Sequence, residues 1–187
     1  RKSDFVLPFY FAQLPAIERP DWPAFRESQR RLASGLDNVS MAVTLDTGHR
    51  TNVHPPLKKP VGGRLAEMAL ANTYHQPEFA NASGPTVNLA KKKESGILIT
   101  FDHCEGGLVC TENSEPRHFQ IADQSGRFVQ ANAELQNGNQ IWVWSESVQR
   151  PNAVRYAWIP YPNPSINVYN HSGYPASPFS INLDEFE

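Results

Sequence analysis

The sequence predicts an α/β segment over residues 1–77 followed by a β-rich domain over residues 78–187. Three observations predict this fold class. Apolar runs alternate with helical patterns in the first part, whereas short runs rich in β-branched and aromatic residues follow from about residue 80. Turn residues separate those later runs, and apolar and polar residues alternate clearly in QIWVWSE. We therefore expect the second part to be an antiparallel, sandwich-like domain.

The first part is expected to contain two strands and two helices. The runs FVLPFYFAQL and VSMAVTLD lack polar alternation, which is typical of parallel strands that are buried on both faces. Asp21 can cap the first helix, Pro23 lies in its first turn and Gly35 can end it. The positions at helical spacing in this helix are Trp22, Phe25, Gln29 and Leu32. Pro60 is expected to open the second helix, whose apolar side is formed by Val61, Leu65, Met68 and Leu70.

The order strand, helix, strand, helix predicts a right-handed crossover in a parallel sheet. Two strands are too few for such a sheet, because a doubly wound sheet usually has about five. Residues 1–77 are therefore expected to be the C-terminal βαβα part of a larger parallel-sheet domain. The chain begins at Arg1 without an initiator methionine, which fits a processed or excised piece.

Composition excludes several kinds of partner. Hydrophobic residues make up 40% of the chain and charged residues 19%, which is typical of a globular protein. The formal net charge of -2 provides no basic surface for nucleic acid or for an anionic membrane. No apolar run approaches the length that spans a bilayer. We therefore expect neither a nucleic-acid nor a membrane partner.

The β-rich part leaves three questions open. Cys104 and Cys110 flank a glycine turn, so they either form a disulfide across a hairpin or remain two buried thiols. Trp142, Trp144, Tyr156 and Trp158 either form a platform for stacking sugars or pack in the core. Because Trp142 and Trp144 share one face of a strand, we expect the core. The last stretch, IPYPNPSINVYNHSGYPASPFS, has no periodicity and is expected to pack as an ordered tail. Glycosylation sequons occur at Asn38, Asn81 and Asn170.

The loop after the second predicted strand carries the candidate chemistry. It holds Asp46, His49, Asn52 and His54, and reactive groups gather at the carboxyl ends of strands in open parallel sheets. A histidine followed by two prolines and a helix can be held rigidly over a cleft as a general base. Two alternatives remain: that both histidines are solvated loop residues, or that Asp46, His49 and His54 bind a metal. The spacing matches no tight ligand pattern, so we predict no metal site.

A catalytic histidine requires a nucleophile, and none is evident in this chain. The serines that precede a glycine all fall in turn-like contexts of the β-rich part or the tail, and they are Ser83, Ser95, Ser125 and Ser172. None of them follows a buried strand and opens a helix, as a nucleophile elbow requires. If His54 is catalytic, we therefore expect its partner outside these residues.

Several segments together resemble one family. LPFYFAQLP, WPAFRESQRRL, MAVTLDTG and VHPPLKKPVGGRLAEMALANTY are similar to the C-terminal half of the sialate O-acetylesterase family, within the SGNH hydrolases. GPTVNLAKK, ILITFDHCEGGL, FQIAD, VRYAWIPYPNPSINVYN and GYPASPF resemble its C-terminal β-domain. The resemblance covers nearly the whole chain in the same order. It implies that residues 1–77 are the end of an SGNH-type, flavodoxin-like parallel-sheet domain.

The resemblance also implies a function and its residues. The family removes O-acetyl groups from sugars, notably sialic acids, with a serine and oxyanion donors that lie upstream of this chain. His54 matches the catalytic histidine, and Gln13 and Asn52 are expected on the substrate side of the cleft. The usual acid is missing, because Thr51 and Asn52 occupy its positions. Asp46 is the candidate acid, and a serine–histidine dyad is the alternative.

Gln13 also has a structural interpretation, as a strand-end group that bonds neighbouring backbone. Arg26 and Gln29 match family positions too, with helix-surface or interhelix hydrogen bonds as their expected role. The resemblance implies no metal or organic cofactor, and a secreted, periplasmic or lysosomal location. The expected partners are an O-acetylated sugar and the N-terminal part of the same protein. The competing hypothesis is an inactive carbohydrate-binding or accessory module of the same fold.

Overall fold

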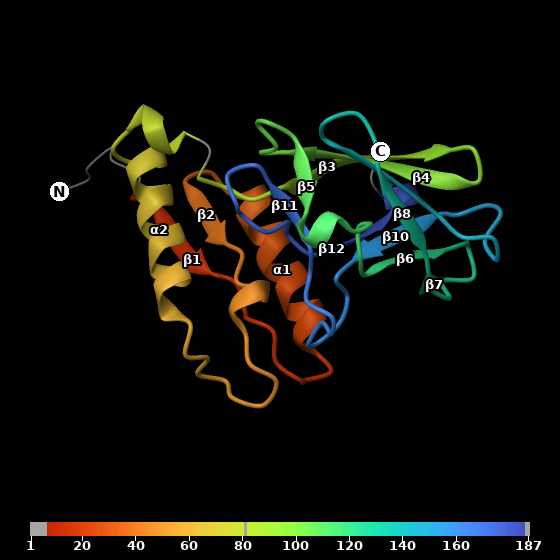
Figure 1. Cartoon of the computed structure of the whole chain (residues 1–187), viewed down its shortest axis with the longest axis horizontal. Helices are drawn as coiled ribbons and strands as arrows, with labels where there is room; N and C mark the ends of the chain where they lie inside the picture. The colour runs from red at the N-terminus through yellow and green to blue at the C-terminus, as the bar shows by residue number, and fades with distance from the viewer. Residues whose placement is uncertain (1–6, 81, 186–187) are drawn as a thin grey trace.

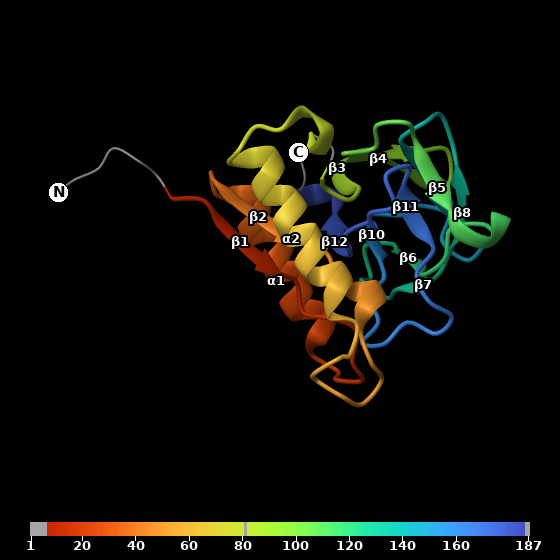
Figure 2. The same cartoon turned by 60° about the vertical axis from the view of Figure 1, so that its left-hand side comes forward.

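The computed structural model describes residues 7–80 and 82–185. The first part contains β1 (Phe9–Ala12), α1 (Trp22–Gly35), β2 (Val39–Ala42) and α2 (Lys58–Asn72). β1 and β2 pair in parallel. α1 packs on β2 and against β12 (Phe179–Asn182), whereas α2 packs on both strands of the pair. The two helices thus cover opposite faces of the strand pair, and α1 lies between it and the β domain (Figures 1 and 2).

The predicted order of strands and helices is therefore present, but α1 presents a different face from the one predicted. Phe25 and Leu32 are 57% and 48% exposed, whereas Arg26, Glu27 and Arg30 are buried. Arg30 and Glu27 neutralise each other, because Arg30 donates two hydrogen bonds to Glu27 of 2.7 and 2.8 Å, whereas Arg26 bonds to backbone carbonyl oxygens. The helical spacing of apolar residues predicted the helix correctly, but the packing of α1 against β2 and β12 decided which of its faces is buried.

Two boundaries also differ from the prediction. α2 begins at Lys58, two residues before Pro60, and Met68 is the buried residue of its predicted apolar side. β2 ends at Ala42, and Asp46 lies in a short 3-10 helix, η1 (Leu45–Thr47). Asp21 is the N-cap residue of α1, but its side chain makes no capping hydrogen bond. In the described ranges, no helix is both long and apolar enough to cross a membrane.

The rest of the chain forms a mostly antiparallel β domain. Within the described residues it has two four-stranded sheets, ordered β3-β4-β9-β8 and β12-β10-β6-β7, and a two-stranded sheet of β5 and β11. Its strands are β3 (Thr86–Lys93), β4 (Gly96–Asp102), β5 (Leu108–Cys110), β6 (Phe119–Ala122), β7 (Val129–Gln130), β8 (Asn132–Leu135), β9 (Gln140–Trp144), β10 (Ala153–Tyr156), β11 (Val168–Asn170) and β12. Further 3-10 helices are η2 (Pro77–Phe79), η3 (Thr111–Asn113) and η4 (Leu183–Glu185).

A single apolar core joins the two larger sheets. Phe101 and Phe179 meet edge to face with ring centroids 6.1 Å apart, and the ring centroids of Phe119 and Tyr156 lie 4.7 Å apart. Tyr156 is 0% exposed, so it belongs to the core as expected. Trp142 and Trp144 do not: the fully buried residues of β9 are Ile141 and Val143, and the two tryptophans point to the opposite, outer face. The prediction that they lie in the core is wrong.

The cysteines are free thiols and form no disulfide. β5 pairs with β11, so Cys110 lies opposite Val168 and not opposite Cys104. Of the two alternatives that the sequence left open, the structure therefore has the unpaired thiols, each of which is half-buried. Burial raises the pKa of the Cys104 thiol to about 12 and that of Cys110 to about 11. Both are accordingly weak nucleophiles at neutral pH, because the reactive species is the thiolate.

The predicted tail is ordered but less irregular than expected, since it contributes strands β11 and β12. It also connects the two parts of the chain. Arg26 of α1 donates hydrogen bonds to the carbonyl oxygens of Ile159 and Pro160, and the Tyr174 hydroxyl donates one to Glu67 of α2. The tail therefore holds the β domain against both helices.

Asn170 is the polar centre of this tail. It is 1% exposed, and its amide nitrogen donates to the carbonyl oxygens of Ser83 and His103 at 2.8 and 2.9 Å. Its side-chain oxygen accepts the Tyr174 N–H at 2.9 Å. Burial of this amide disfavours glycosylation at its sequon, whereas Asn38 is exposed and Asn81 lies outside the described residues.

We expect Asn170→Ala to lower the free energy of unfolding by about 2–4 kcal/mol, because a buried side chain loses its three hydrogen bonds. Asn170→Asp should be at least as damaging, since a carboxylate oxygen would then face two carbonyl oxygens. Urea denaturation followed by circular dichroism measures both changes. The exposed Asn132→Ala is the control and should stay within about 0.5 kcal/mol of wild type. A stable Asn170→Asp protein would contradict the prediction.

Candidate active site

The candidate site lies where the two parallel strands end. Because β1 and β2 run in the same direction, the loops that follow them leave the same edge of the pair, and both project from one end of the molecule (Figures 1 and 2). Hydrogen bonds join the two loops: His49 N–H donates to the Ala16 carbonyl at 3.0 Å, and Glu18 N–H donates to the Arg50 carbonyl at 2.9 Å. The loop that carries Asp46, His49, Asn52 and His54 therefore starts at this edge of the strand pair and lies against the loop that follows β1.

Gly48 allows the close approach of these loops. A Cβ atom at this position would lie 2.1 Å from the Ala16 carbonyl oxygen, so no larger residue fits without moving the backbone. Arg50 then fixes the loop from its outer side, with an ion pair to Glu18 at 3.2 Å and its guanidinium 5.3 Å from the Tyr161 ring centroid. The histidine loop is thus held by the first loop and by the tail.

The loop that carries His54 is organised by His49 and Asn52. The Nδ1 atom of His49 accepts the N–H groups of Thr51 and Asn52 at 3.2 and 3.0 Å. The side-chain oxygen of Asn52 accepts the His54 N–H at 2.9 Å. His54 itself is exposed, and no hydrogen bond joins its ring to another residue of the described ranges. Asn52, expected on the substrate side, has a structural contact that shapes the turn before His54.

Asp46 is bound to Arg64 of α2. Its two oxygens accept hydrogen bonds of 2.7 and 2.6 Å from the Arg64 guanidinium, which also donates to the Val43 carbonyl at 2.7 Å. Burial alone would lower the pKa of Arg64, but the hydrogen bond and charge of Asp46 raise it above the ordinary value. Within the described part of the chain, no hydrogen bond joins Asp46 to the His54 ring. The ion pair anchors the start of the loop to α2.

Gln13 is only 1% exposed. Its backbone carbonyl accepts the Thr44 hydroxyl at 2.6 Å, and its amide nitrogen lies 3.4 Å from the Arg26 carbonyl. These contacts match the structural interpretation, in which a strand-end side chain bonds neighbouring backbone. Gln29 has a similar structural role, because its side-chain oxygen accepts the Leu14 N–H at 2.9 Å. Neither contact brings these residues together with His54.

The arrangement therefore offers an exposed imidazole, that of His54, whose ring has no hydrogen-bond partner in the described residues, on a tethered loop. A neutral imidazole can accept a proton from a hydroxyl that is brought within hydrogen-bond distance. Among the described residues, no group of three His, Cys, Asp or Glu side chains is placed to hold a metal ion. The Asp46 carboxylate is bound to Arg64 and the His49 Nδ1 atom to backbone N–H groups, so the suggested metal ligands are already engaged.

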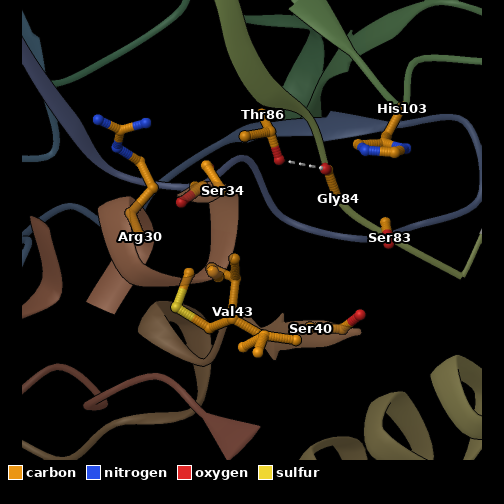
Figure 3. Close-up of a pocket in the computed structure, with 12 residues that line it drawn as sticks. Arg30, Ser34, Ser40, Val43, Ser83, Gly84, Thr86 and His103 are labelled. Atoms are coloured by element: carbon orange, nitrogen blue, oxygen red, sulfur yellow. Dashed lines mark hydrogen bonds between the residues drawn. The ribbon is translucent and has the colours of Figure 1, made fainter. Parts of the chain in front are cut away.

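A cavity that the sequence did not predict lies between the two parts of the chain. Its volume is about 170 Å³, and polar side chains line much of it (Figure 3). Ser40, Ser83 and His103 contribute to its wall (Figure 3). In the part of the chain that the structure describes, no hydrogen bond joins the His103 ring to either serine, so this cavity holds no serine–histidine pair. Its residues come from segments far apart in the sequence, and no local pattern marks them.

The chain is similar to a carbohydrate acetylesterase of known structure. No protein-family model matches the chain, and no curated protein sequence matches it. It is similar to the crystal structure of a novel carbohydrate acetylesterase from Xanthomonas citri, with a TM-score of 0.84 and 31% sequence identity. The match covers 94% of this chain and 41% of the acetylesterase chain. The chain thus spans less than half the length of that protein, with nearly all of its own residues matched.

Proposed function

We propose that this chain is part of a carbohydrate esterase that removes O-acetyl groups from sugars. The observation that carries the proposal is the match to the Xanthomonas citri acetylesterase, which extends over 94% of the chain at 31% identity. An exposed histidine on a tethered loop at the strand ends adds chemical support, because ester hydrolysis by a serine requires such a base. More specifically, we propose that the substrate is an O-acetylated sialic acid.

In the proposed mechanism, the nucleophile comes from polypeptide outside these 187 residues. A serine oxygen attacks the acetyl carbonyl while His54 accepts the serine proton, and His54 then protonates the departing sugar oxygen, which leaves as a hydroxyl. His54 next takes a proton from the water that attacks the acetyl-serine, and it returns this proton to the serine oxygen as acetate leaves. Oxyanion donors of the same upstream segment stabilise the tetrahedral intermediates. The family resemblance supports a secreted, periplasmic or lysosomal site of action.

The orientation of His54 requires a partner as well. Asp46 is the proposed acid, but both of its oxygens are bound to Arg64. Thr51 and Asn52 carry no charge, so they cannot replace it. A serine–histidine dyad, in which a backbone carbonyl or a neutral side chain orients the ring, fits these contacts better.

The missing carboxylate partner of His54 favours a second candidate function. The His54 ring has no carboxylate bonded to it in the described residues, which is also expected of a fold that has lost catalysis. In that case the chain belongs to an inactive carbohydrate-binding or accessory module.

One experiment separates the two functions. The protein is expressed together with the sequence encoded upstream of Arg1 and incubated with O-acetylated sialic acid, with an acetylated xylan and with a fluorophosphonate that labels active serines. Acetate release with labelling of one serine supports the esterase, and the preferred acetyl donor identifies the sugar class. Without labelling or acetate release from either substrate, the esterase proposal is wrong and the inactive module remains.

A further inference from the structure

The outer face of the sheet β3-β4-β9-β8 carries an unusual pair of tryptophans. Alternate residues of β4 and β9 fill the core and are 0% exposed, namely Ile97, Ile99, Ile141 and Val143. The residues between them point outward, and Trp142 and Trp144 remain partly exposed there. Large aromatic side chains on a solvent-facing sheet face are a common feature of interaction surfaces.

The two indole rings stack face to face, so that each ring covers one face of the other. Their centroids are 4.1 Å apart and their planes differ by 16°. Gly96 of β4 makes room for them: a Cβ atom there would lie 2.5 Å from the Trp142 Nε1 atom and 3.1 Å from the Trp144 Cβ atom. The missing side chain at Gly96 therefore allows the rings to lie over the neighbouring strand.

Polar side chains border the stack on both sides. On the β8 side, Glu134 lies opposite Trp142 and Asn132 lies opposite Trp144, and both are exposed. On the β3 side, Lys91 pairs with Leu98, and the Lys93 ammonium lies 5.8 Å from the Trp142 ring centroid. Since neighbouring strands lie about 4.8 Å apart, the two borders are roughly 14 Å apart. The surface thus offers an aromatic strip between hydrogen-bond donors and acceptors.

Packing accounts for part of this arrangement. Leu98, which pairs with Trp142, lies on the same outer face and is buried with the indoles in place. The Trp142 Nε1 atom is buried as well and has no hydrogen-bond partner in the described residues, which costs free energy. The indole surface that stays partly exposed between the polar borders is available to a ligand.

We infer that Trp142 and Trp144 form a carbohydrate-binding surface, separate from the His54 loop, that takes a segment of a glycan chain. The apolar face of a pyranose ring stacks on the indole face that the other ring leaves uncovered, as aromatic side chains allow. Sugar hydroxyls then bond to Glu134 and Asn132 on one side and to the lysines on the other. The choice of sugar as ligand rests on the proposed function, whereas the surface itself rests on the tryptophan geometry.

The surface lies apart from the candidate catalytic loop. In Figures 1 and 2, β4 lies on the far side of the β domain from the loop between β2 and α2. A glycan bound there is not positioned for attack at its own acetyl group. The surface instead retains the protein on a polymer, and acetylated residues at other positions of that polymer reach His54.

Affinity gel electrophoresis tests the inference, with soluble β-glucan, xylan, mannan or sialylated mucin in the gel. Wild type should be retarded by at least one polymer, and Trp142→Ala/Trp144→Ala should weaken the binding at least about tenfold. Glu134→Ala/Asn132→Ala leaves the indoles in place and should weaken the binding by a smaller factor. If the tryptophan variant does not fold, loss of binding in this border variant is the test of the inference. Leu89→Ala removes another exposed apolar residue of β3 and should change nothing.

Three outcomes would overturn the inference: no retardation of wild type by any polymer, equal binding by the tryptophan and border variants, or a wild-type dimer that the tryptophan variant dissolves. The last would make a second copy the occupant of this face. The assay contains no hydrolysis step, so it is independent of the esterase proposal. His54→Ala should bind the polymer as wild type does, whether or not the protein is an esterase.

Discussion

Replacing His54 with alanine is expected to lower acetyl-ester hydrolysis by about a thousandfold or more, because the serine then lacks its general base. The measurement is kcat/KM for p-nitrophenyl acetate, with the variant made in the protein that includes the upstream sequence. Binding of the sugar should change much less than kcat, since His54 acts on the proton and not on the sugar ring. The thermal unfolding temperature should be unchanged, because the ring has no hydrogen-bond partner in the described residues.

A matched control is His171→Ala, which removes an exposed histidine of the β domain. It should keep the full rate of hydrolysis. Asp46→Asn tests the role of this carboxylate. If the enzyme uses a serine–histidine dyad, the substitution should lower the thermal unfolding temperature together with the rate, because Asp46 then acts only by anchoring the loop. A His54→Ala protein that hydrolyses the ester at the wild-type rate would remove this residue from the mechanism.

Arg26→Ala is expected to lower the free energy of unfolding by about 4 kcal/mol, through lost hydrogen bonds and a cavity in a packed site. Arg26 is 0% exposed and donates hydrogen bonds of 3.2 and 2.7 Å to the carbonyl oxygens of Ile159 and Pro160. No carboxylate is hydrogen-bonded to it in the described residues, and burial lowers its pKa to about 10. Its charge is therefore retained at neutral pH at the cost of desolvation.

Arg26→Met should be less damaging, with a loss of about 1–2 kcal/mol, because methionine fills the space and removes the buried charge. The Pro160 carbonyl would keep the Ile17 N–H as a donor at 3.1 Å, so only the Ile159 carbonyl would lose its partner. Arg31→Ala on the same helix is the control. Arg31 is mostly exposed in an ion pair with Glu27, so its loss should cost less than about 1 kcal/mol. Equal losses for Arg26→Met and Arg26→Ala, measured by urea denaturation, would contradict this account.

The site was predictable to the extent that it depends on one loop. The run VSMAVTLD, followed by turn residues and a helix, indicates a strand-end loop with two histidines, and the resemblance to the sialate O-acetylesterase family singled out His54. The partner of Asp46 was not predictable, because Arg64 lies 18 residues further on and on a helix. The role of the tail was not predictable either, since the contact between Arg26 and Pro160 joins residues that are 134 positions apart.

The sequence by itself determined which segments are helices and strands and where the histidine loop falls, because hydrophobic periodicity and turn residues act within a few positions of the chain. The tertiary structure alone decided which side of each element is covered. It turned Trp142 and Trp144 outward, buried the charged side of α1, and paired β5 with β11 in place of a cysteine hairpin. Periodicity specifies that an element has two sides, but contacts with distant segments determine which of them meets the core.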